Sequence, residues 1–247
     1  MKLFLIFLMI LSCSQINTEN SKDPITIRIT KKFPVLNNLG QVDSYFTQDA
    51  YVHFKEDLRI YETPYFFDSS NNNTLTAPEI RYKVFIHHKD SIYGRVFDAQ
   101  NNLYNLIILK DSFTSITSFS DLKLNELFAN ENLLMLSSEK DLNQGLYKET
   151  YSIKSHEDST KTGLVIYYYN SKLNSIDFTL SKELDSIHKM KLYEVMVQTN
   201  PQILKENGMK IDTLRVTNKF ELISQYNFER INEFIVKYLE KAKNSFQ

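Results

Sequence analysis

Hydrophobic and polar residues alternate along most of the chain, beginning near residue 25. In the segment ITIRITK (25–31), isoleucine occupies every second position, and threonine or arginine stands between. A period of two predicts a half-buried β-strand, because successive side chains of a strand point to opposite faces. Further strands are expected at 51–54, 58–62, 81–88, 91–98 and 103–110. Their polar connections predict an antiparallel meander in this N-terminal β-rich region, residues 24–111.

The spacing of apolar residues changes between residues 112 and 144. Within SDLKLNELFANENLLML (120–136), leucine and phenylalanine recur at near-helical intervals, which predicts a helical connector. A second β-rich region is expected at 145–247, with strands at 145–153, 163–170, 175–181, 190–198 and 212–223. Before the last of these strands, Asn200-Pro201 and Gly208 are typical start and stop signals, which predict a short helix around 201–206.

The clearest helix is expected over the final segment, QYNFERINEFIVKYLEKAKNSFQ (225–247). Its apolar residues mark one face: Phe228, Ile231, Phe234, Ile235, Tyr238 and Leu239. Such a helix commonly covers one face of a sheet, although an amphipathic helix can also bind a membrane or a partner. The predicted fold class is α+β, with mainly antiparallel β meanders, a short helical connector and a C-terminal amphipathic helix. One or two subdomains are compatible with this pattern.

The chain begins with a different kind of segment. Lys2 is followed by nine apolar residues at 3–11. As a helix this run would be about 14 Å long at ~1.5 Å per residue, about half of the ~30 Å hydrocarbon layer of a membrane. A positive charge followed by a short apolar run is typical of a secretory signal peptide, here residues 1–12. The fold is therefore interpreted without it.

The end of this segment, Ile10-Leu11-Ser12-Cys13, resembles the lipobox of bacterial lipoproteins. The resemblance implies that Cys13 becomes the first residue of the mature chain and carries fatty acyl chains such as palmitate. Leu11 departs from the small residue that the family prefers there, so ordinary signal-peptidase cleavage around Ser12 and Ser14 remains an alternative. Cys13 is the only cysteine, which excludes an internal disulfide.

Residues 13–23 are then expected to form the lipidated cysteine and a flexible, polar tether. Ser14 follows the cysteine where enteric lipoproteins that stay in the inner membrane carry aspartate. The resemblance therefore implies an outer-membrane protein that faces the periplasm of a bacterial cell envelope. The expected partners are the membrane, through the lipid, and another envelope protein.

Composition narrows the functional classes. Charged residues make up 24% of the 247 residues and the formal net charge is −1, so there is no field of one sign to attract nucleic acid. The motifs of phosphate-binding loops, zinc proteases and serine hydrolases do not occur in the sequence. No catalytic residue, metal site or cofactor is therefore predicted.

Histidine and acidic side chains are the candidate ligands and acid–base groups of the sequence. His87 and His88 are adjacent on a predicted strand, so their side chains point to opposite faces and cannot chelate one ion together without a bulge. Asp90 could lie near His88 across the turn, but two ligands do not make a closed zinc site. The run at 156–158, His-Glu-Asp, is interpreted as a solvated loop tip, with weak cation binding as the alternative. Glu183 and Asp185 could form an acid–base pair, but solvating charges explain them more simply.

Three consecutive tyrosines suggest a contact surface. Tyr168 should share a face with Leu164 and Ile166, whereas Tyr167 and Tyr169 should share the opposite face. Burial of that face would make Tyr167 and Tyr169 core residues, which is the favoured interpretation. Exposure would make them an aromatic contact surface.

The sequence thus predicts a membrane-tethered envelope lipoprotein that acts as a non-enzymatic binding or scaffold module. The alternatives are an envelope hydrolase whose site is not visible in the sequence and a periplasmic carrier of an apolar ligand. If the protein is a hydrolase, we expect a polar cleft with clustered carboxylates or histidines. If it is a carrier, we expect an apolar cavity on the order of several hundred Å³. A scaffold predicts an exposed aromatic patch.

Overall fold

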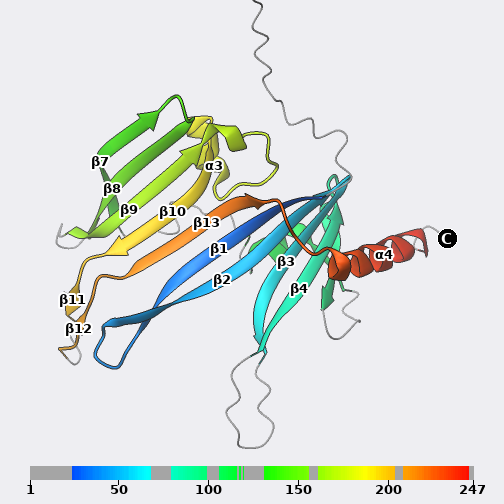
Figure 1. Ribbon diagram of the computed structural model, residues 1–247, viewed down its shortest axis with the longest axis horizontal. Coiled ribbons are helices and arrows are strands. Elements are labelled where there is room, and N and C mark those ends of the chain that lie inside the picture. The colour runs from blue at the N-terminus through cyan, green and yellow to red at the C-terminus, as the bar shows by residue number, and fades with distance from the viewer. Residues whose placement is uncertain are drawn as a thin grey trace, which may run out of the picture.

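One antiparallel sheet of eleven strands forms the body of the protein (Figure 1). The computed structural model describes residues 24–67, 79–98, 106–115, 117, 119, 131–155, 161–203 and 208–244. The strands follow one another across the sheet in the order β6-β5-β4-β3-β2-β1-β13-β10-β9-β8-β7. Their bounds are β1 (Ile25–Leu36), β2 (Val42–Lys55), β3 (Leu58–Phe67), β4 (Glu79–His88), β5 (Tyr93–Asp98), β6 (Leu106–Leu109), β7 (Glu131–Asp141), β8 (Leu146–Ser155), β9 (Lys161–Asn170), β10 (Lys191–Thr199) and β13 (Arg215–Ile223).

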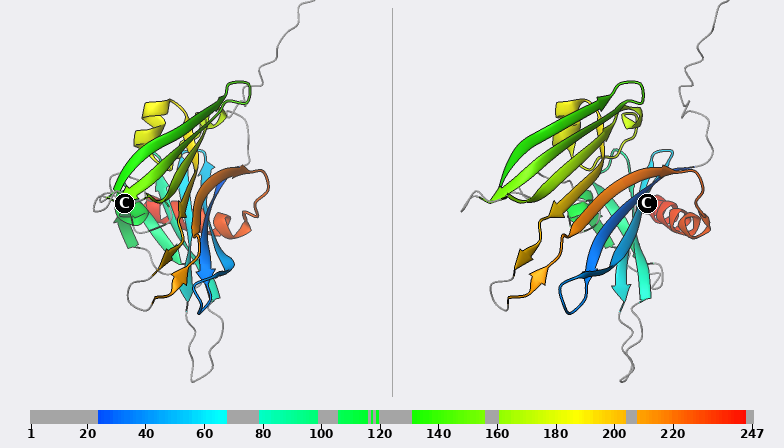
Figure 2. Two further views of the ribbon diagram at one scale, coloured as in Figure 1. Left: turned by 90° about the vertical axis from the view of Figure 1, so that its left-hand side faces the viewer. Right: turned by 60° about the vertical axis from the view of Figure 1, so that its left-hand side comes forward.

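Shorter elements complete the described part of the chain. They are the helices α1 (Lys110–Ser115), α3 (Lys182–His188) and α4 (Glu229–Asn244), the 3-10 turn η1 (Ser171–Leu173), and the strands β11 (Gln202–Ile203) and β12 (Lys210–Ile211). β11 and β12 pair in a small hairpin of their own. This hairpin lies beside the tip of the β1–β2 hairpin, where the backbone N–H of Asp212 donates to the carbonyl oxygen of Gly40 at 3.1 Å (Figures 1 and 2).

The predicted antiparallel meander is confirmed. Strands β1 to β6 neighbour one another in chain order, and so do β7 to β10. The two halves of the chain join where β13 pairs with β1, for example Arg28 opposite Glu221. The two β-rich regions of the sequence therefore belong to a single sheet, which is strongly twisted (Figure 2).

The inner face of the sheet carries the larger core. Ile27, Ile29 and Val52 lie on it and are fully buried. Phe113 of α1 and Leu184 of α3 belong to the same cluster, so these two helices cover the inner face. Its other buried members are Ala50, Tyr61, Phe85, Phe119, Ile153, Val165, Tyr167, Tyr169, Phe178, Leu180, Leu192, Val195 and Phe220.

The outer face carries Arg28, Thr30 and Asp49, and α4 covers it only at one end. The helix packs Ile231, Phe234 and Ile235 against the outward-facing side chains of β3, β4 and β5, which are Ile60, Val84, Ile86 and Phe97. The predicted C-terminal helix is therefore confirmed, together with its role as a cover for a sheet. The outer face over β2, β1 and β13 is left open to solvent at a groove.

Three expectations about local structure are wrong. Residues 131–136, expected in a helix, form part of β7, where 131–135 pair with β8 and the register shifts between Met135 and Ser137. Residues 175–181, expected as a strand, form an irregular segment that buries Phe178 and Leu180 and leads into α3. Residues 202–203, expected in a helix, pair with 210–211 as β11 and β12. Helix α1, at 110–115, overlaps only the start of the predicted connector (112–144) and lies before the predicted helix.

Several expectations concern residues outside the described ranges. These are the signal peptide at 1–12, Cys13 with the tether at 13–23, the remainder of the predicted helix at 120–130, and the loop at 156–158. Among the helices of the described ranges, none combines the length and the apolar character that crossing a membrane requires.

Candidate functional site

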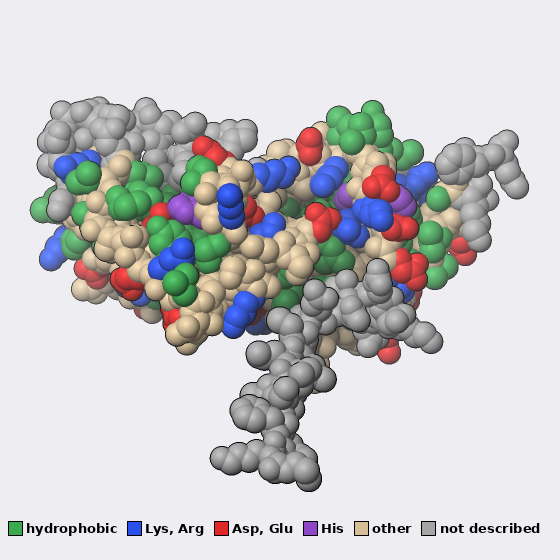
Figure 3. Space-filling view, turned by 90° about the horizontal axis from the view of Figure 1, so that it is seen from above, with side chains coloured by type: hydrophobic (Ala, Val, Ile, Leu, Met, Phe, Trp, Pro, Cys, Tyr) green, Lys and Arg blue, Asp and Glu red, His purple; other side chains and the backbone are tan. Residues whose placement is uncertain are grey.

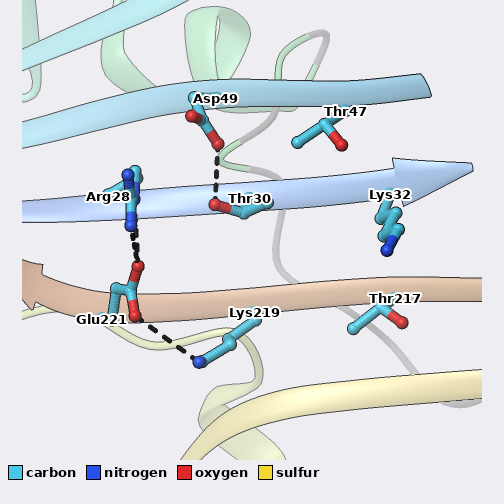
Figure 4. Close-up of a pocket in the computed structure, with 8 residues that line it drawn as sticks. All are labelled: Arg28, Thr30, Lys32, Thr47, Asp49, Thr217, Lys219 and Glu221. Carbon is cyan, nitrogen blue, oxygen red and sulfur yellow. Dashed lines mark hydrogen bonds and ion pairs between the residues drawn. The ribbon is translucent and has the colours of Figure 1, made fainter. Parts of the chain in front are cut away.

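An open groove of about 360 Å³ lies on the outer face over β2, β1 and β13 (Figure 4). Ionic and hydroxyl side chains line it: Arg28, Thr30, Lys32, Thr47, Asp49, Thr217, Lys219 and Glu221. Viewed from above, basic and acidic side chains are interspersed over the molecule rather than gathered by sign (Figure 3). The groove has the same mixture, with the basic side chains of Arg28, Lys32 and Lys219 beside the acidic side chains of Asp49 and Glu221.

Strand alternation and register together build this groove. On β1, burial of Ile27 and Ile29 turns Arg28, Thr30 and Lys32 outward. The register then places partners opposite them on both neighbouring strands. Thr30 stands between Asp49 of β2 and Lys219 of β13, Lys32 between Thr47 and Thr217, and Arg28 faces Glu221.

Arg28 and Glu221 form the ion pair at one end of the groove. The Nε of Arg28 donates to Oε1 of Glu221 at 3.0 Å, and Nη2 donates to the same oxygen. This bond holds the pKa of Glu221 below its usual range and raises the pKa of Arg28. The side chains are 40% and 36% exposed, so water screens the pair and its net contribution to stability is at most about 1 kcal/mol.

Some of the remaining side chains of the groove are paired with a neighbour in it, and others are not. Lys219 Nζ lies 3.5 Å from Oε2 of Glu221, and the hydroxyl of Thr30 donates to Asp49 Oδ1 at 2.7 Å. Among the eight residues drawn in Figure 4, Lys32, Thr47 and Thr217 make no interaction with another one of the set. The groove therefore has a half closed by internal pairs and a half that presents an ammonium and hydroxyl groups.

Tyrosines of β2 stand at both ends of the groove. Tyr45 and Tyr51 lie on the outer face of β2, six residues apart, which is about 20 Å at ~3.4 Å per residue. The ammonium of Lys32 lies 4.7 Å from the ring centroid of Tyr45. At the other end, the ring of Tyr51 lies 5.1 Å from that of Tyr226 and 6.5 Å from that of Tyr82. We call the groove together with Tyr45 and Tyr51 the polar strip.

A buried polar cluster lies beside the polar strip, beneath the segment that enters α4. The hydroxyl of Thr26 lies 3.0 Å from Nδ1 of His53, and Nε2 of His53 lies 3.4 Å from Oε2 of Glu62. The hydroxyl of Tyr226 donates to the same carboxylate oxygen. Each residue comes from a different segment, namely β1, β2, β3 and the β13–α4 connection.

This cluster has the order hydroxyl, imidazole, carboxylate that acyl-transfer enzymes use. However, Thr26 is 1% exposed and His53 and Glu62 are fully buried. A hollow of about 550 Å³ lies outside it, lined by Pro24, Thr26, Ile223, Ser224, Gln225, Tyr226, Asn227 and Phe228. Because the Thr26 hydroxyl is withdrawn from solvent and bonded to His53, the cluster is arranged to hold β1, β2 and β3 against the α4 segment rather than to attack a substrate.

A second buried carboxylate lies on the inner face. Glu149 is 2% exposed and accepts hydrogen bonds from the hydroxyl of Tyr147 at 2.8 Å and that of Tyr169 at 3.1 Å. Nε2 of His188 lies 3.3 Å from the same carboxylate. Burial, followed by the nearby Glu149, raises the pKa of Tyr169 far above its usual range. Two tyrosine hydroxyls and an imidazole lie against this carboxylate, which fits a structural anchor for α3.

The proposed tyrosine contact surface is wrong. Tyr167 and Tyr169 are 2% and 0% exposed and belong to the core of the inner face. The alternation itself is as predicted, because Tyr168 points to the other face and is half-buried. The two rings therefore serve the packing of the sheet, as the core interpretation of these residues expects.

The structure separates the two adjacent histidines as the sequence predicts. His87 is buried, whereas the side chain of His88 is 45% exposed and its Nδ1 lies 3.6 Å from Oδ2 of Asp90. Nδ1–H of His87 donates to the carbonyl oxygens of His88 and Ser91. Within the described ranges, no group of three or more histidine, cysteine, aspartate or glutamate side chains is placed to hold a metal ion.

Glu183 and Asp185 both lie in the first turn of α3. Asp185 accepts a hydrogen bond from the backbone N–H of Leu192 at 2.8 Å and pairs with Lys191 at 3.2 Å, whereas Glu183 is exposed. Residues two apart on a helix do not face one another. The alternative of an acid–base pair is therefore wrong, and Asp185 fastens α3 to β10.

The sequence did not identify the polar strip, although a signal was present. Every second residue of TIRITK (26–31) and of VTNKFEL (216–222) is polar or charged, and both segments were predicted as strands. Their pairing with each other was not predictable from spacing.

No protein-family model matches the chain, and no curated protein sequence matches it either.

Proposed function

We propose that this protein is a membrane-tethered lipoprotein of a bacterial cell envelope that acts as a non-enzymatic binding module, with the polar strip as its binding surface. The observation that carries the binding role is the groove over β2, β1 and β13, which α4 leaves open in the middle of the outer face. The resemblance of Ile10–Cys13 to a lipobox supports the tether.

The tether would give the binding surface freedom of orientation. Ten residues, 14–23, separate Cys13 from Pro24 at the start of the described body. Fully extended, they would span about 35 Å at ~3.5 Å per residue. The outer face would therefore be able to turn towards a ligand in the periplasm while the lipid stays in the membrane.

The two rival functions have less support. A hydrolase needs a nucleophile or acid–base group that substrate can reach, whereas Thr26 and His53 are buried. A carrier needs an enclosed apolar cavity, whereas the groove and the hollow beside Thr26 are both open and bear polar side chains. The proposed binding module requires only an accessible surface of fixed geometry.

The tether is tested by labelling cells with an alkyne-bearing palmitate. The wild-type chain should be tagged and should sediment with outer membranes, and Cys13→Ala should be unlabelled. An untagged wild type would remove the lipoprotein proposal.

The binding role is tested by placing a photoreactive amino acid at position 47, in the groove, and in a matched chain at position 183, exposed on α3. Irradiation of living cells should give a discrete adduct from position 47 and none from position 183. Equal adducts from both positions, or none from position 47, would contradict the assignment of the groove.

A further inference from the structure

We propose that the ligand of the polar strip is an acidic glycan, a chain of hydroxyl-rich rings that carries carboxylate or phosphate groups. This inference rests on the proposed binding function and names its ligand class. It follows from the position of the strip in the sheet, from the kinds of side chains that line it, and from the placement of its rings and charges.

The position of the strip favours a ligand that is recognised by side chains. β1 is paired on both sides, by β2 and β13, and these strands are paired in turn by β3 and β10. The backbone N–H and C=O groups of β1 are therefore used within the sheet over Thr26–Lys32, whereas β2 pairs with β3 only over 51–55. An extended peptide that adds a strand needs a free sheet edge, which β1, at the centre of the strip, does not offer.

The lining of the strip suits a ligand with many hydroxyl groups. Thr47 and Thr217 each supply a group that both donates and accepts hydrogen bonds, and the Thr30 hydroxyl, which donates to Asp49, can still accept one. The carboxylates of Asp49 and Glu221 add acceptors beside them. A sugar hydroxyl also donates and accepts, so a row of hydroxyls, carboxylates and ammonium groups can satisfy successive hydroxyls along a chain.

The tyrosine rings give the strip flat apolar contacts at its ends. Tyr45 is 42% exposed and is held in place by Lys32, whose ammonium lies 4.7 Å from its ring centroid. Tyr51 is half-buried at the other end, supported by the ring of Tyr226. A tyrosine ring offers a large apolar area at little entropic cost. The two rings are spaced to contact separate units of one extended chain.

The charges of the strip favour an anionic substituent in its open half. Arg28 is held by Glu221, and the Thr30 hydroxyl is held by Asp49. Lys32 extends from β1 towards β13, beside Thr217 (Figure 4). Lys219 stands on the neighbouring strand, two residues from Thr217. Lys32, with the hydroxyls of Thr47 and Thr217 beside it, forms a subsite for a carboxylate or phosphate on the glycan, and Lys219, which is paired with Glu221, adds a second positive charge at its border.

The test measures binding of the full-length chain in detergent to three probes. Purified cell-wall sacculi carry carboxylates on the short peptides attached to their glycan, lipopolysaccharide micelles carry phosphates on their sugars, and dextran is a neutral glycan. We expect binding to at least one acidic probe, weakening as salt is added, and no binding to dextran. Binding to sacculi and binding to lipopolysaccharide are measured separately, so the result shows which of the two supplies the anionic glycan.

Matched variants assign the binding to the strip. The double variant Lys32→Ala/Lys219→Ala should lower the affinity about tenfold, as expected for the loss of charge-assisted hydrogen bonds. Tyr45→Ala should lower it several-fold, while Tyr45→Phe keeps the ring and should retain most of it. Lys140→Ala and Tyr93→Ala, exposed on β7 and β5, should bind as the wild type does. Thermal melts confirm that each variant is folded.

The outcomes separate this inference from the proposed function. Equal binding to dextran, or unchanged binding by the lysine and tyrosine variants, would overturn the acidic-glycan assignment. If no glycan binds but the probe at position 47 captures a protein, the glycan inference fails and the binding module stands. If position 47 also gives no adduct, both fail.

Discussion

The hydroxyl of Tyr226 donates a hydrogen bond to the buried carboxylate of Glu62, although the two residues are 164 positions apart in the chain. Glu62 lies on β3 and is fully buried, and Tyr226 lies in the segment between β13 and α4. Nε2 of His53 lies 3.4 Å from the same carboxylate oxygen. This contact fastens the start of the terminal helix to the sheet and thereby fixes which part of the outer face α4 covers.

Replacing Tyr226 with phenylalanine tests that role. The ring would remain, but the buried carboxylate would lose a donor, so we expect a loss of about 1–3 kcal/mol in the free energy of unfolding. Urea denaturation followed by circular dichroism measures it. Tyr238→Phe, which removes a hydroxyl from a half-buried ring on α4, is the control and should change stability by less than about 0.5 kcal/mol. Equal effects of the two variants would show that the contact with Glu62 contributes nothing.

His87 makes stability depend on pH. Burial lowers its pKa below the ordinary value of 6.5, with the nearby cations Lys110 and Arg59 acting in the same direction, while the carbonyl oxygens that accept from Nδ1–H oppose the shift. The unfolded chain therefore takes up a proton at a pH where the folded imidazole stays neutral. The stabilisation is present above pH 6.5 and is lost as the pH falls towards the folded pKa.

The expected result is a lower free energy of unfolding for the wild type at pH 5 than at pH 7, with a smaller difference for His87→Gln. Denaturation curves at a series of pH values measure this slope. His88→Gln, on the exposed neighbour, should leave the slope unchanged. A slope that survives in His87→Gln would assign the pH dependence to other groups.

Local sequence patterns predicted much of the fold. The alternation in ITIRITK and the apolar face of 228–239 identified β1 and α4 because each pattern depends only on neighbours along the chain. The same reasoning misplaced residues 131–136, where clustered leucines fit a helix as well as a strand and pairing with β8 decides between them. It also missed α3, although Ser181 caps its N-terminus by accepting from Leu184 N–H.

The polar strip was beyond such patterns. Arg28 meets Glu221 across 193 positions, and this contact depends on which strands become neighbours and in what register. A shift of β13 by one residue would turn Thr217, Lys219 and Glu221 to the other face. The outward-facing residues of each strand could therefore be predicted from the sequence. Their meeting in one groove could not, because it depends on the order and register of the strands in the sheet.

The closing helix should depend on Phe234 more than on its exposed neighbours. Phe234 is 3% exposed and its ring centroid lies 5.5 Å from that of Phe97 on β5. Phe234→Ala would leave a cavity and should cost about 3–5 kcal/mol of stability. Val236→Ala, at a position 54% exposed on the same helix, should cost less than about 1 kcal/mol. Chemical denaturation compares them, and similar costs would mean that α4 is not packed on the outer face as described.

Gly40 joins the β1–β2 hairpin tip to the β11–β12 hairpin. Its φ is +76°, and a Cβ there would lie 2.5 Å from the carbonyl oxygen of Lys210. Gly208 has a similar φ of +71°, but a Cβ there would meet nothing within 4 Å among the described residues. Substitution of Gly208 by alanine therefore measures backbone strain alone, whereas substitution of Gly40 also measures the clash with Lys210.

Gly208→Ala should cost about 1–2 kcal/mol, the strain of a left-handed residue that carries a Cβ. Gly40→Ala should cost more, because the backbone of Lys210 must also move away, and it should break the hydrogen bond from Asp212 N–H to the Gly40 carbonyl. Urea denaturation measures both costs, and hydrogen exchange at the Asp212 amide reports the contact directly. Unchanged protection of that amide in Gly40→Ala would show that the hairpins are not held together at this point, since the added methyl group leaves no room for the present approach.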